Sequence, residues 1–251
     1  MAVLMNDVAG ESEYVCVDRA SGECKTVVID LEMCKVPKSR RFGYGLSMEI
    51  IQIGAVSLDE NGEILDKFVS FVRPEYGFID SAINRLTGIR QYDVKNAPIL
   101  RDVLARFTEW LGSSPVVMSS WSMTDRAQLY SEIGAKGIDG TRIQSVIQAW
   151  EDCQAIFSEK MDNVHRRYSL DYAIKVTDIQ MEEKEHDALA DAYNTALLYQ
   201  KMRREKTLQL NKYYVRVFRN EVPDRLQYSV GEVLKGIKFY MHNRGMKKAK
   251  I

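Results

Sequence analysis

The sequence predicts an α/β fold whose central sheet is mixed and carries helices on both faces. Three β-rich segments follow one another early in the chain, at residues 26–32, 49–57 and 63–72. The last two are separated by Asn61-Gly62, a strong signal for a tight hairpin. From residue 98 onward, helical periodicity alternates with short apolar runs, which is the pattern of strands joined through helices. An antiparallel meander followed by parallel strands is therefore expected.

The first strand, residues 26–32, is expected to organise the rest of the fold. Its run Thr26–Ile29 is β-branched without a polar break, which is typical of a strand buried on both faces of a sheet. Asp30 and Glu32 follow, and side chains two apart on a strand share a face. Two carboxylates on one face repel each other, and a divalent cation held by oxygen ligands is the usual reason for such a pair. A solvated strand end is the alternative.

Residues 33–45 are rich in Lys, Arg, Gly and Pro and are expected to form a loop beside these carboxylates. Basic side chains there could contact phosphates, and an aromatic ring could stack on a base. A solvated loop is the alternative. The residues concerned are Lys35, Lys38, Arg40 and Arg41, with Phe42 or Tyr44 for stacking.

The remaining elements follow from apolar spacing and from Pro and Gly punctuation. A helix is expected to open at Pro98, and residues 143–150 fit either a strand or a helix. The apolar positions of the helix after Pro98 are Leu100, Val103, Leu104, Phe107 and Leu111. The other expected elements are a loop or short helix at 83–89, a short buried strand at 115–120, and helices at about 125–133, 153–161, 170–176 and 187–202.

One domain at residues 25–203 is expected, with an arm or edge strand at 1–24 and a basic extension at 204–251. From Lys201 to the end the chain carries 14 Lys and Arg against 4 Asp and Glu. Two interpretations of this tail stay open: it binds a polyanionic partner, or it is a solvated extension. Within the tail, a strand at 213–218 and a helix at 230–242 are the candidate elements.

The composition is that of an ordinary soluble globular protein, with 45% hydrophobic and 28% charged residues. No apolar run approaches the roughly 20 residues of a membrane helix, and the first residues lack the pattern of a signal peptide. No membrane partner is expected. The cysteines Cys16, Cys24, Cys34 and Cys153 show no C-x-x-C spacing, so reduced thiols and a cytoplasmic location are expected.

Three further residues are expected beside the two acids of the first strand. Asp125 follows a short buried strand and stands at the start of a helix, whose dipole favours an anion. A plain helix N-cap is the alternative for Asp125. If Asp187 caps the helix expected at 187–202, His186 precedes its start and Asp191 falls in its second turn, so both can face one point. Taken singly, His186 is a helix-entry residue and Asp187 is a cap.

Together these motifs resemble the DEDD exonuclease superfamily in its histidine-bearing, DnaQ-like branch, closest to the KapD-like and Eri-type exonucleases. The resemblance covers roughly residues 25–203 and implies an RNase H-like fold. The motifs that carry it are Ile29-Asp30-Leu31-Glu32, Glu49–Val56, Leu86-Thr87-Gly88-Ile89, Trp121-Ser122-Met123-Thr124-Asp125 and His186-Asp187-Ala188-Leu189-Ala190-Asp191.

The resemblance implies hydrolysis of single-stranded nucleic acid from a free 3′ end, releasing 5′-mononucleotides. Two ions, Mg²⁺ or Mn²⁺, would lie about 3.5–4 Å apart. Their ligands would be Asp30, which bridges both ions, with Glu32, Asp125 and Asp191. His186 would accept the proton of the attacking water, a role that suits an imidazole because this group changes charge between about pH 5 and 8.

The resemblance also implies substrate contacts at Met33, Leu86, Thr87, Gly88 and Trp121. Met33 stands where many relatives have Thr, so a hydrogen bond from that side chain is missing. For Trp121, a place in the core is the alternative. RNA is favoured over DNA, and the oligomeric state is open.

Two other functions stay open. One is a nucleic-acid-binding or regulatory protein of the same fold with little hydrolysis. The intact set of five site residues argues against it, because a non-catalytic descendant does not need the histidine. The other is a proofreading or processing module whose tail docks it to a larger complex.

Overall fold

The computed structural model describes residues 24–41, 45–161, 165–181 and 186–215. In these residues the chain forms five strands: β1 (Lys25–Lys35), β2 (Met48–Leu58), β3 (Ile64–Phe71), β4 (Val116–Ser120) and β5 (Trp150–Asp152). The same part of the chain contains nine labelled helices, besides a helical turn at residues 212–215: α1 (Lys38–Arg41), α2 (Ser81–Thr87), α3 (Gln91–Val94), α4 (Leu100–Leu111), α5 (Met123–Ala135), α6 (Thr141–Gln148), α7 (Cys153–Lys160), α8 (Leu170–Thr177) and α9 (Ala188–Arg204).

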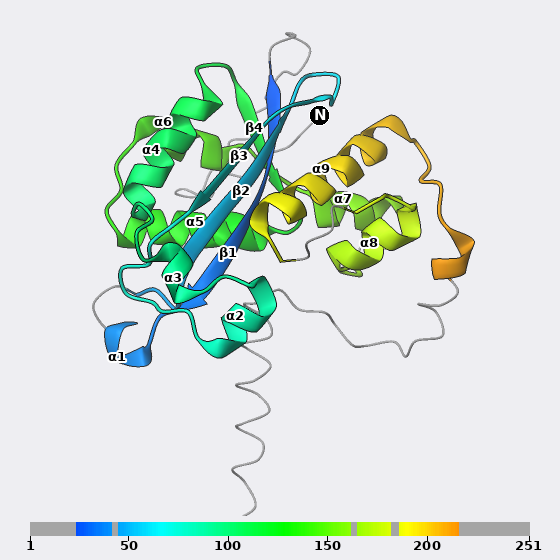
Figure 1. Ribbon diagram of the computed structural model, residues 1–251. Helices are drawn as coiled ribbons and strands as arrows, with labels where there is room; N and C mark the ends of the chain where they lie inside the picture. Colours follow the sequence, from blue (N-terminus) through cyan, green and yellow to red (C-terminus); the bar gives the residue numbers. More distant parts are fainter. Residues whose placement is uncertain (1–23, 42–44, 162–164, 182–185, 216–251) are drawn as a thin grey trace, which may run out of the picture.

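The five strands form one mixed sheet in the order β3-β2-β1-β4-β5, which can be followed in Figure 1. β1 lies at the centre of this sheet. It pairs antiparallel with β2, and β2 pairs antiparallel with β3. On the other side, β1 pairs parallel with β4, and β4 with β5. The predicted antiparallel meander followed by parallel strands is confirmed.

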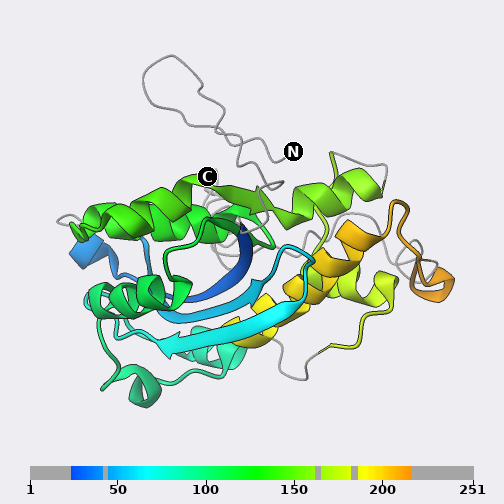
Figure 2. The same cartoon turned by 90° about the horizontal axis from the view of Figure 1, so that it is seen from above.

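Helices cover both faces of this sheet, as Figures 1 and 2 show. On one face, side chains of α4, α5 and α6 form a core with Val27, Ile29 and Leu31 of β1. On the other face, side chains of α7, α8 and α9 form a second core with Val28. Successive side chains of a strand point to opposite faces, so the apolar run of β1 is buried on both, as predicted.

Two local predictions are confirmed in detail. The turn between β2 and β3 is closed by Asp59, whose Oδ1 accepts the backbone N–H groups of Asn61 (2.9 Å) and Glu63 (2.7 Å). Gly62 has φ +82° there, a conformation that glycine adopts without steric cost. All five apolar positions predicted for the helix after Pro98 are buried in α4.

Two predicted boundaries need correction. β1 continues to Lys35, because its pairing with β2 resumes after a bulge between Glu32 and Met33. Residues 33–35 therefore belong to the strand and not to a loop. The ambiguous segment 143–150 contains two elements, since α6 ends at Gln148 and Trp150 then pairs with Met118 of β4.

The prediction of a strand at residues 213–218 is wrong for residues 213–215, because residues 212–215 are helical. Asn211 explains this start, since its side chain accepts the N–H of Tyr213 (3.0 Å) and its carbonyl accepts the N–H of Val215 (3.1 Å). Residues 216–218, the arm at 1–23 and the helix expected at 230–242 lie outside the described residues.

Residues 205–215 pack on the domain, which bears on where the basic extension starts. Leu208 is buried in the core that α7, α8 and α9 share. The Asn211 N–H donates to the Val176 carbonyl (2.7 Å), and Lys160 Nζ donates to the Glu205 carbonyl (2.7 Å). Truncation after Arg204 would therefore remove buried contacts as well as charge.

Three of the basic side chains expected to meet phosphates make contacts within the fold. Lys35 Nζ pairs with Asp80 (3.2 Å), Arg40 donates to the Tyr76 carbonyl and Arg41 to the Val36 carbonyl. Lys38 is exposed. A phosphate contact by these residues stays a prediction, and Phe42 and Tyr44 lie outside the described residues.

Cys34 and Cys153 are free thiols and both are buried, and Cys24 is buried as well. Cys16 lies outside the described part of the chain. Among the described helices, none has the length and apolar character needed to cross a membrane.

Candidate active site

Asp30 and Glu32 project from β1 toward α9, as the spacing predicts. Val28, two positions before Asp30, belongs to the core that α9 shares, and side chains two apart on a strand share a face. Glu32 is buried, whereas Asp30 is half-buried. The bulge that follows Glu32 ends this regular alternation, so the two acids are the last residues of the regular part of β1.

Asp125 lies in the first turn of α5 and is buried. It is not the N-cap, because the Ser122 side chain accepts the N–H of Thr124 in that role. Asp125 Oδ1 instead accepts the Leu31 N–H (3.2 Å). β4 pairs with β1 only as far as Val28, so Asp125 provides an acceptor to β1 beyond the end of that ladder. This contact places the Asp125 carboxylate beside the two acids of β1.

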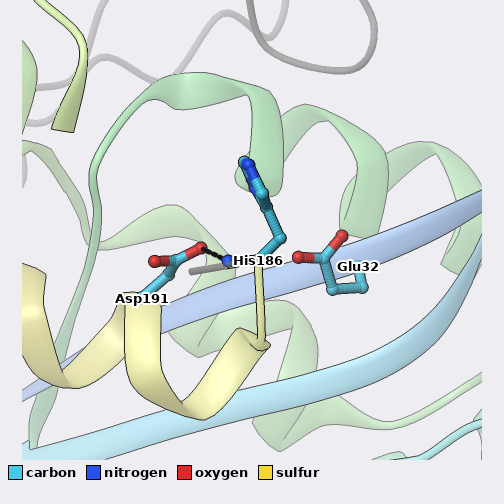
Figure 3. A group of neighbouring side chains, drawn as sticks. All are labelled: Glu32, His186 and Asp191. Atoms are coloured by element: carbon cyan, nitrogen blue, oxygen red, sulfur yellow. Dashed lines mark hydrogen bonds between the residues drawn. The ribbon is translucent and has the colours of Figure 1, made fainter. Parts of the chain in front are cut away.

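His186 and Asp191 come from the start of α9. The Asp187 side chain caps the helix by accepting the N–H groups of Leu189 and Ala190, as predicted, and Asp191 falls at the end of the first turn, not in the second. Asp191 Oδ2 accepts the His186 N–H (3.2 Å). Figure 3 shows this bond, with the Asp191 carboxylate on one side of His186 and the Glu32 carboxylate on the other.

The residues from β1, α5 and α9 converge on one point. Ligand atoms of Glu32, His186 and Asp191 all lie within 4.8 Å of one another. Asp30 and Asp125 belong to the same electrostatic cluster, because the pKa of Asp30 is raised by its burial and then by the charges of Asp125 and Asp191. The structure thus brings together the five residues that the sequence singled out.

The carboxylates in this cluster disfavour one another's ionisation. Burial, followed by the charges of neighbouring carboxylates, raises the pKa of Asp30 and of Glu32 well above the ordinary range. For Asp125, burial raises the pKa, the Leu31 N–H lowers it and Asp191 raises it again, with a net pKa of about 7. A cation at this point would relieve the repulsion.

The donor set fits a hard divalent cation. Carboxylate oxygens are the ligands that Mg²⁺ and Mn²⁺ prefer, and an imidazole nitrogen is compatible with Mn²⁺. Three such donors already lie within coordinating reach of one point. Crowded buried carboxylates are costly without a partner of opposite charge, which gives the cluster a physical reason to bind metal.

Comparison with known proteins places the chain in a family. Residues 27–199 match the RNase T family, whose description is Exonuclease. The chain belongs to this exonuclease family. The prediction of a DnaQ-like exonuclease is confirmed.

Two relatives are about equally similar to this chain. The PolC-type DNA polymerase III of Caldanaerobacter subterraneus subsp. tengcongensis is 31% identical over 195 residues, which span 78% of this chain and 12% of that protein. ERI1 exoribonuclease 2 of Danio rerio is 30% identical over 220 residues, which span 77% of this chain and 37% of that protein. The match to ERI1 exoribonuclease 2 supports the predicted Eri-type branch. The chain spans well under half the length of both relatives.

Solved structures show the same fold. A full-length 3′-exonuclease superposes with a TM-score of 0.62 at 19% identity, covering 76% of this chain and 64% of that one. The nuclease domain of 3′hExo, a DEDDh family member bound to rAMP, gives a TM-score of 0.60 at 20% identity, covering 75% and 96%. The RNase H-like fold class predicted for this chain is confirmed.

The predicted substrate contacts lie at two places. Thr87, at the end of α2, is buried, and its Oγ1 donates to the Ile83 carbonyl (3.0 Å) and accepts the Ile89 N–H (3.0 Å). Gly88 has φ +73° as the C-cap of α2 and is exposed, and Leu86 is partly exposed. Contact of this helix end with substrate stays a prediction.

Met33 and Trp121 are buried in the two cores. The Trp121 indole N–H donates to the Tyr168 carbonyl (3.1 Å), and its ring packs on Phe157. These contacts favour the core position for Trp121 over stacking on a base. Contact of either side chain with substrate stays a prediction.

Sequence reasoning missed two residues of β2 that lie against the start of α9. The side chain of Gln52 is hydrogen-bonded to Asp187 and Ala188, and Gly54 contacts the helix backbone. A glycine in the middle of an apolar strand was the available signal, because it marks close approach of another backbone.

Proposed function

We propose that this chain is a metal-dependent 3′–5′ exonuclease that hydrolyses single-stranded nucleic acid, RNA in preference to DNA, to 5′-mononucleotides. One observation carries the proposal. Carboxylates from β1, α5 and α9 converge with a histidine in a chain of the exonuclease family.

Asp30, Glu32, Asp125 and Asp191 would hold two ions of Mg²⁺ or Mn²⁺. When bound, such ions lower the pKa of an attacking water and stabilise the charge on the leaving 3′-oxygen. The buried carboxylates of Glu32 and Asp125 have little freedom to move, because each lies in packed surroundings. Asp125 is further fixed by the Leu31 N–H, so the chain presents preformed oxygen donors.

His186 would take the proton from the attacking water. Its side chain is exposed, so water can reach it, and a ring nitrogen lies near the Glu32 and Asp191 carboxylates. Asp191 holds the backbone of His186 through its N–H. A general base needs this combination of access to water and fixed position.

RNA is favoured because one relative that is 30% identical over most of this chain is an exoribonuclease by name. The equally similar PolC-type relative is a DNA polymerase by name. That second match makes a proofreading module of a larger DNA-copying complex the alternative function.

The test is a time course on 5′-labelled single-stranded RNA and DNA oligonucleotides of one sequence, with Mg²⁺ or Mn²⁺. The expected result is a ladder that shortens from the 3′ end, faster on RNA, with 5′-mononucleotides as product and no reaction in chelator. Substrate with a blocked 3′ end should persist.

Asp30→Asn should abolish release, because it removes a carboxylate of the cluster while keeping the shape of the side chain. Asp102→Asn, an exposed acid in the first turn of α4, is the matched control and should react like wild type. Normal turnover by Asp30→Asn would overturn the metal assignment. Faster reaction on DNA would favour the proofreading alternative.

A further inference from the structure

Two residues of β2 are the cross-strand neighbours of the acids of β1. Gly54 is the cross-strand partner of Asp30, and Gln52 is the partner of Glu32. Residues opposite each other in an antiparallel pair share a face, so both β2 residues point to the side on which α9 lies. We call Gln52 and Gly54 the α9 seat.

Gly54 lets the helix lie against the strand without a side chain between them. A Cβ atom built at this position would lie 2.2 Å from Ala188 C and Leu189 N, and 2.3 Å from Ala188 O. These are backbone atoms of the first turn of α9, which cannot rotate away as a side chain can. Any residue other than glycine would therefore move the start of α9 off the sheet.

Gln52 binds the first turn of α9 through both the oxygen and the nitrogen of its side-chain amide. Its Oε1 accepts the Ala188 N–H (3.2 Å), and its Nε2 donates to Asp187 Oδ2 (3.3 Å). The residue is buried. Asp187 Oδ1 in turn accepts the N–H groups of Leu189 and Ala190. The first N–H donors of α9 are thus satisfied within the protein, and their hydrogen bonds fix the helix start on β2.

This contact sets the place of two site residues. His186 directly precedes Asp187, and Asp191 lies one turn into the helix and bonds back to the His186 N–H. Asp30 and Glu32 stand on the neighbouring strand, in register with the seat. The distance between the β1 acids and the α9 residues therefore depends on how closely the first turn of α9 contacts β2.

Building on the proposed function, we propose that the α9 seat is a positioning device for the catalytic centre and that Gln52 is a positioning residue. An amide suits this place because it both donates and accepts while adding no charge beside Glu32 and Asp187. A residue of similar size without polar atoms would leave the Ala188 N–H without an acceptor and release the helix start.

The test compares Gln52→Met with Gln200→Met. Gln200 lies in α9 near its other end, and its Nε2 donates to the Gly62 carbonyl, so both variants remove a glutamine-to-backbone hydrogen bond that ties α9 to the sheet. kcat and KM on the preferred oligonucleotide, the dissociation constant for Mn²⁺ by calorimetry, and the melting temperature in chelator are measured for each.

Gln52→Met should lower kcat and weaken Mn²⁺ binding by about 10–100-fold each, the usual effect of losing a residue that orients metal ligands, with KM little changed. Gln200→Met should lower the melting temperature but keep both values. Gln52→Glu keeps an acceptor for the Ala188 N–H but loses the donor to Asp187 and adds a charge beside Glu32 and Asp187, so it should lower kcat as well.

Wild-type kcat and Mn²⁺ affinity in both Gln52 variants would overturn the positioning role alone. A wild-type protein that neither releases nucleotides nor binds Mn²⁺ would overturn the proposed function, and the positioning role with it. The two failures are therefore distinguishable.

Discussion

His186 has a left-handed backbone conformation, with φ +60°. For a residue other than glycine this conformation costs of order 1–3 kcal/mol and persists only where the surroundings enforce it. Here the Asp191 carboxylate accepts the His186 N–H, and the Asp187 cap follows directly. The strain is thus held at the point where we propose that a proton is accepted.

His186→Ala should slow hydrolysis by about 10²–10⁴-fold at pH 7, the usual contribution of a general base. His186→Asn separates this effect from backbone strain, because asparagine tolerates the left-handed region better than most residues. Both variants should be equally slow in single-turnover assays. His165→Ala, at an exposed position, should react normally. Unchanged kinetics in His186→Ala would remove His186 from the mechanism.

At the level of single residues, the sequence predicted what depends on local periodicity. The shared face of Asp30 and Glu32 follows from the strand repeat, and the convergence of His186 and Asp191 follows from the Asp187 cap. The bond from the Leu31 N–H to Asp125 could not be predicted, because it depends on where β4 stops pairing with β1.

At the level of elements, a buried ion network joins β2, α5 and the segment after β3. Lys136, which follows α5, contacts Glu49 (2.6 Å), Glu132 (2.9 Å) and Glu75 (3.0 Å). Glu49 also accepts the N–H groups of Glu75, Tyr76 and Gly77. The segment that Glu49 binds, residues 75–77, leads through Asp80 into α2, the helix with the predicted substrate contacts.

This network makes a prediction about acid stability. Burial raises the pKa of Glu49, but the hydrogen bonds from Lys136 and from backbone N–H groups lower it by more. Its net pKa therefore lies below the ordinary value. An acid with a lowered folded-state pKa contributes stability above its unfolded pKa and loses it as pH falls through the folded value.

Glu49→Gln should therefore lower the free energy of unfolding by about 3–5 kcal/mol at pH 7, as expected when one partner of a buried ion pair is removed. The difference from wild type should shrink as pH falls below about 4, near the unfolded pKa of Glu. Urea titrations from pH 3 to pH 7 measure it. Glu63→Gln, at an exposed pair with Arg204, is the control and should change little. A constant offset at every pH would contradict the assigned ionisation of Glu49.

Predictions of helices and strands succeeded where apolar spacing alone determines the element. They failed where the element depends on pairing with another strand. α4 could be predicted because its five apolar positions repeat at helical spacing, and all of them are buried. β5 could not be separated from α6, because its three residues become a strand only through pairing with β4. The helical turn at 212–215 begins with an Asn211 cap, a signal that the aromatic run after it concealed.

At the level of the whole molecule, the charge is divided between the domain and the tail. Residues 216–251 carry nine Lys and Arg against three Asp and Glu. Because residues 205–215 pack on the domain, truncation after Val215 separates the charge from the fold better than truncation after Arg204.

Truncation after Val215 should weaken oligonucleotide binding and flatten its dependence on salt between about 50 and 200 mM, because fewer counterions are released. Fluorescence anisotropy of the Asp30→Asn protein, with and without residues 216–251, measures this without cleavage. The loss should be equal for oligonucleotides of different sequence. An identical salt slope would make these residues a structural or partner-docking element.

We expect the acid cluster to make the stability of the whole domain depend on metal. Without a cation, the carboxylates of Asp30, Glu32, Asp125 and Asp191 repel one another, as the raised pKa values of the first three indicate. A divalent ion that binds only the folded protein adds about 2.7 kcal/mol at a hundredfold excess over its dissociation constant. Melting temperature should therefore rise with Mn²⁺ or Mg²⁺ and fall again with chelator.

Asp191→Asn tests whether the same carboxylates cause both the repulsion in the metal-free protein and the stabilisation by bound metal. The asparagine carbonyl can still accept the His186 N–H, so the turn before α9 is kept while one charge is removed. The metal-free variant should melt above metal-free wild type, because repulsion is reduced, and its gain from Mn²⁺ should be smaller, because a ligand is lost. Asp102→Asn should change neither value. If wild type melts at one temperature in saturating Mn²⁺ and in chelator, the acids of β1, α5 and α9 do not bind metal as a unit.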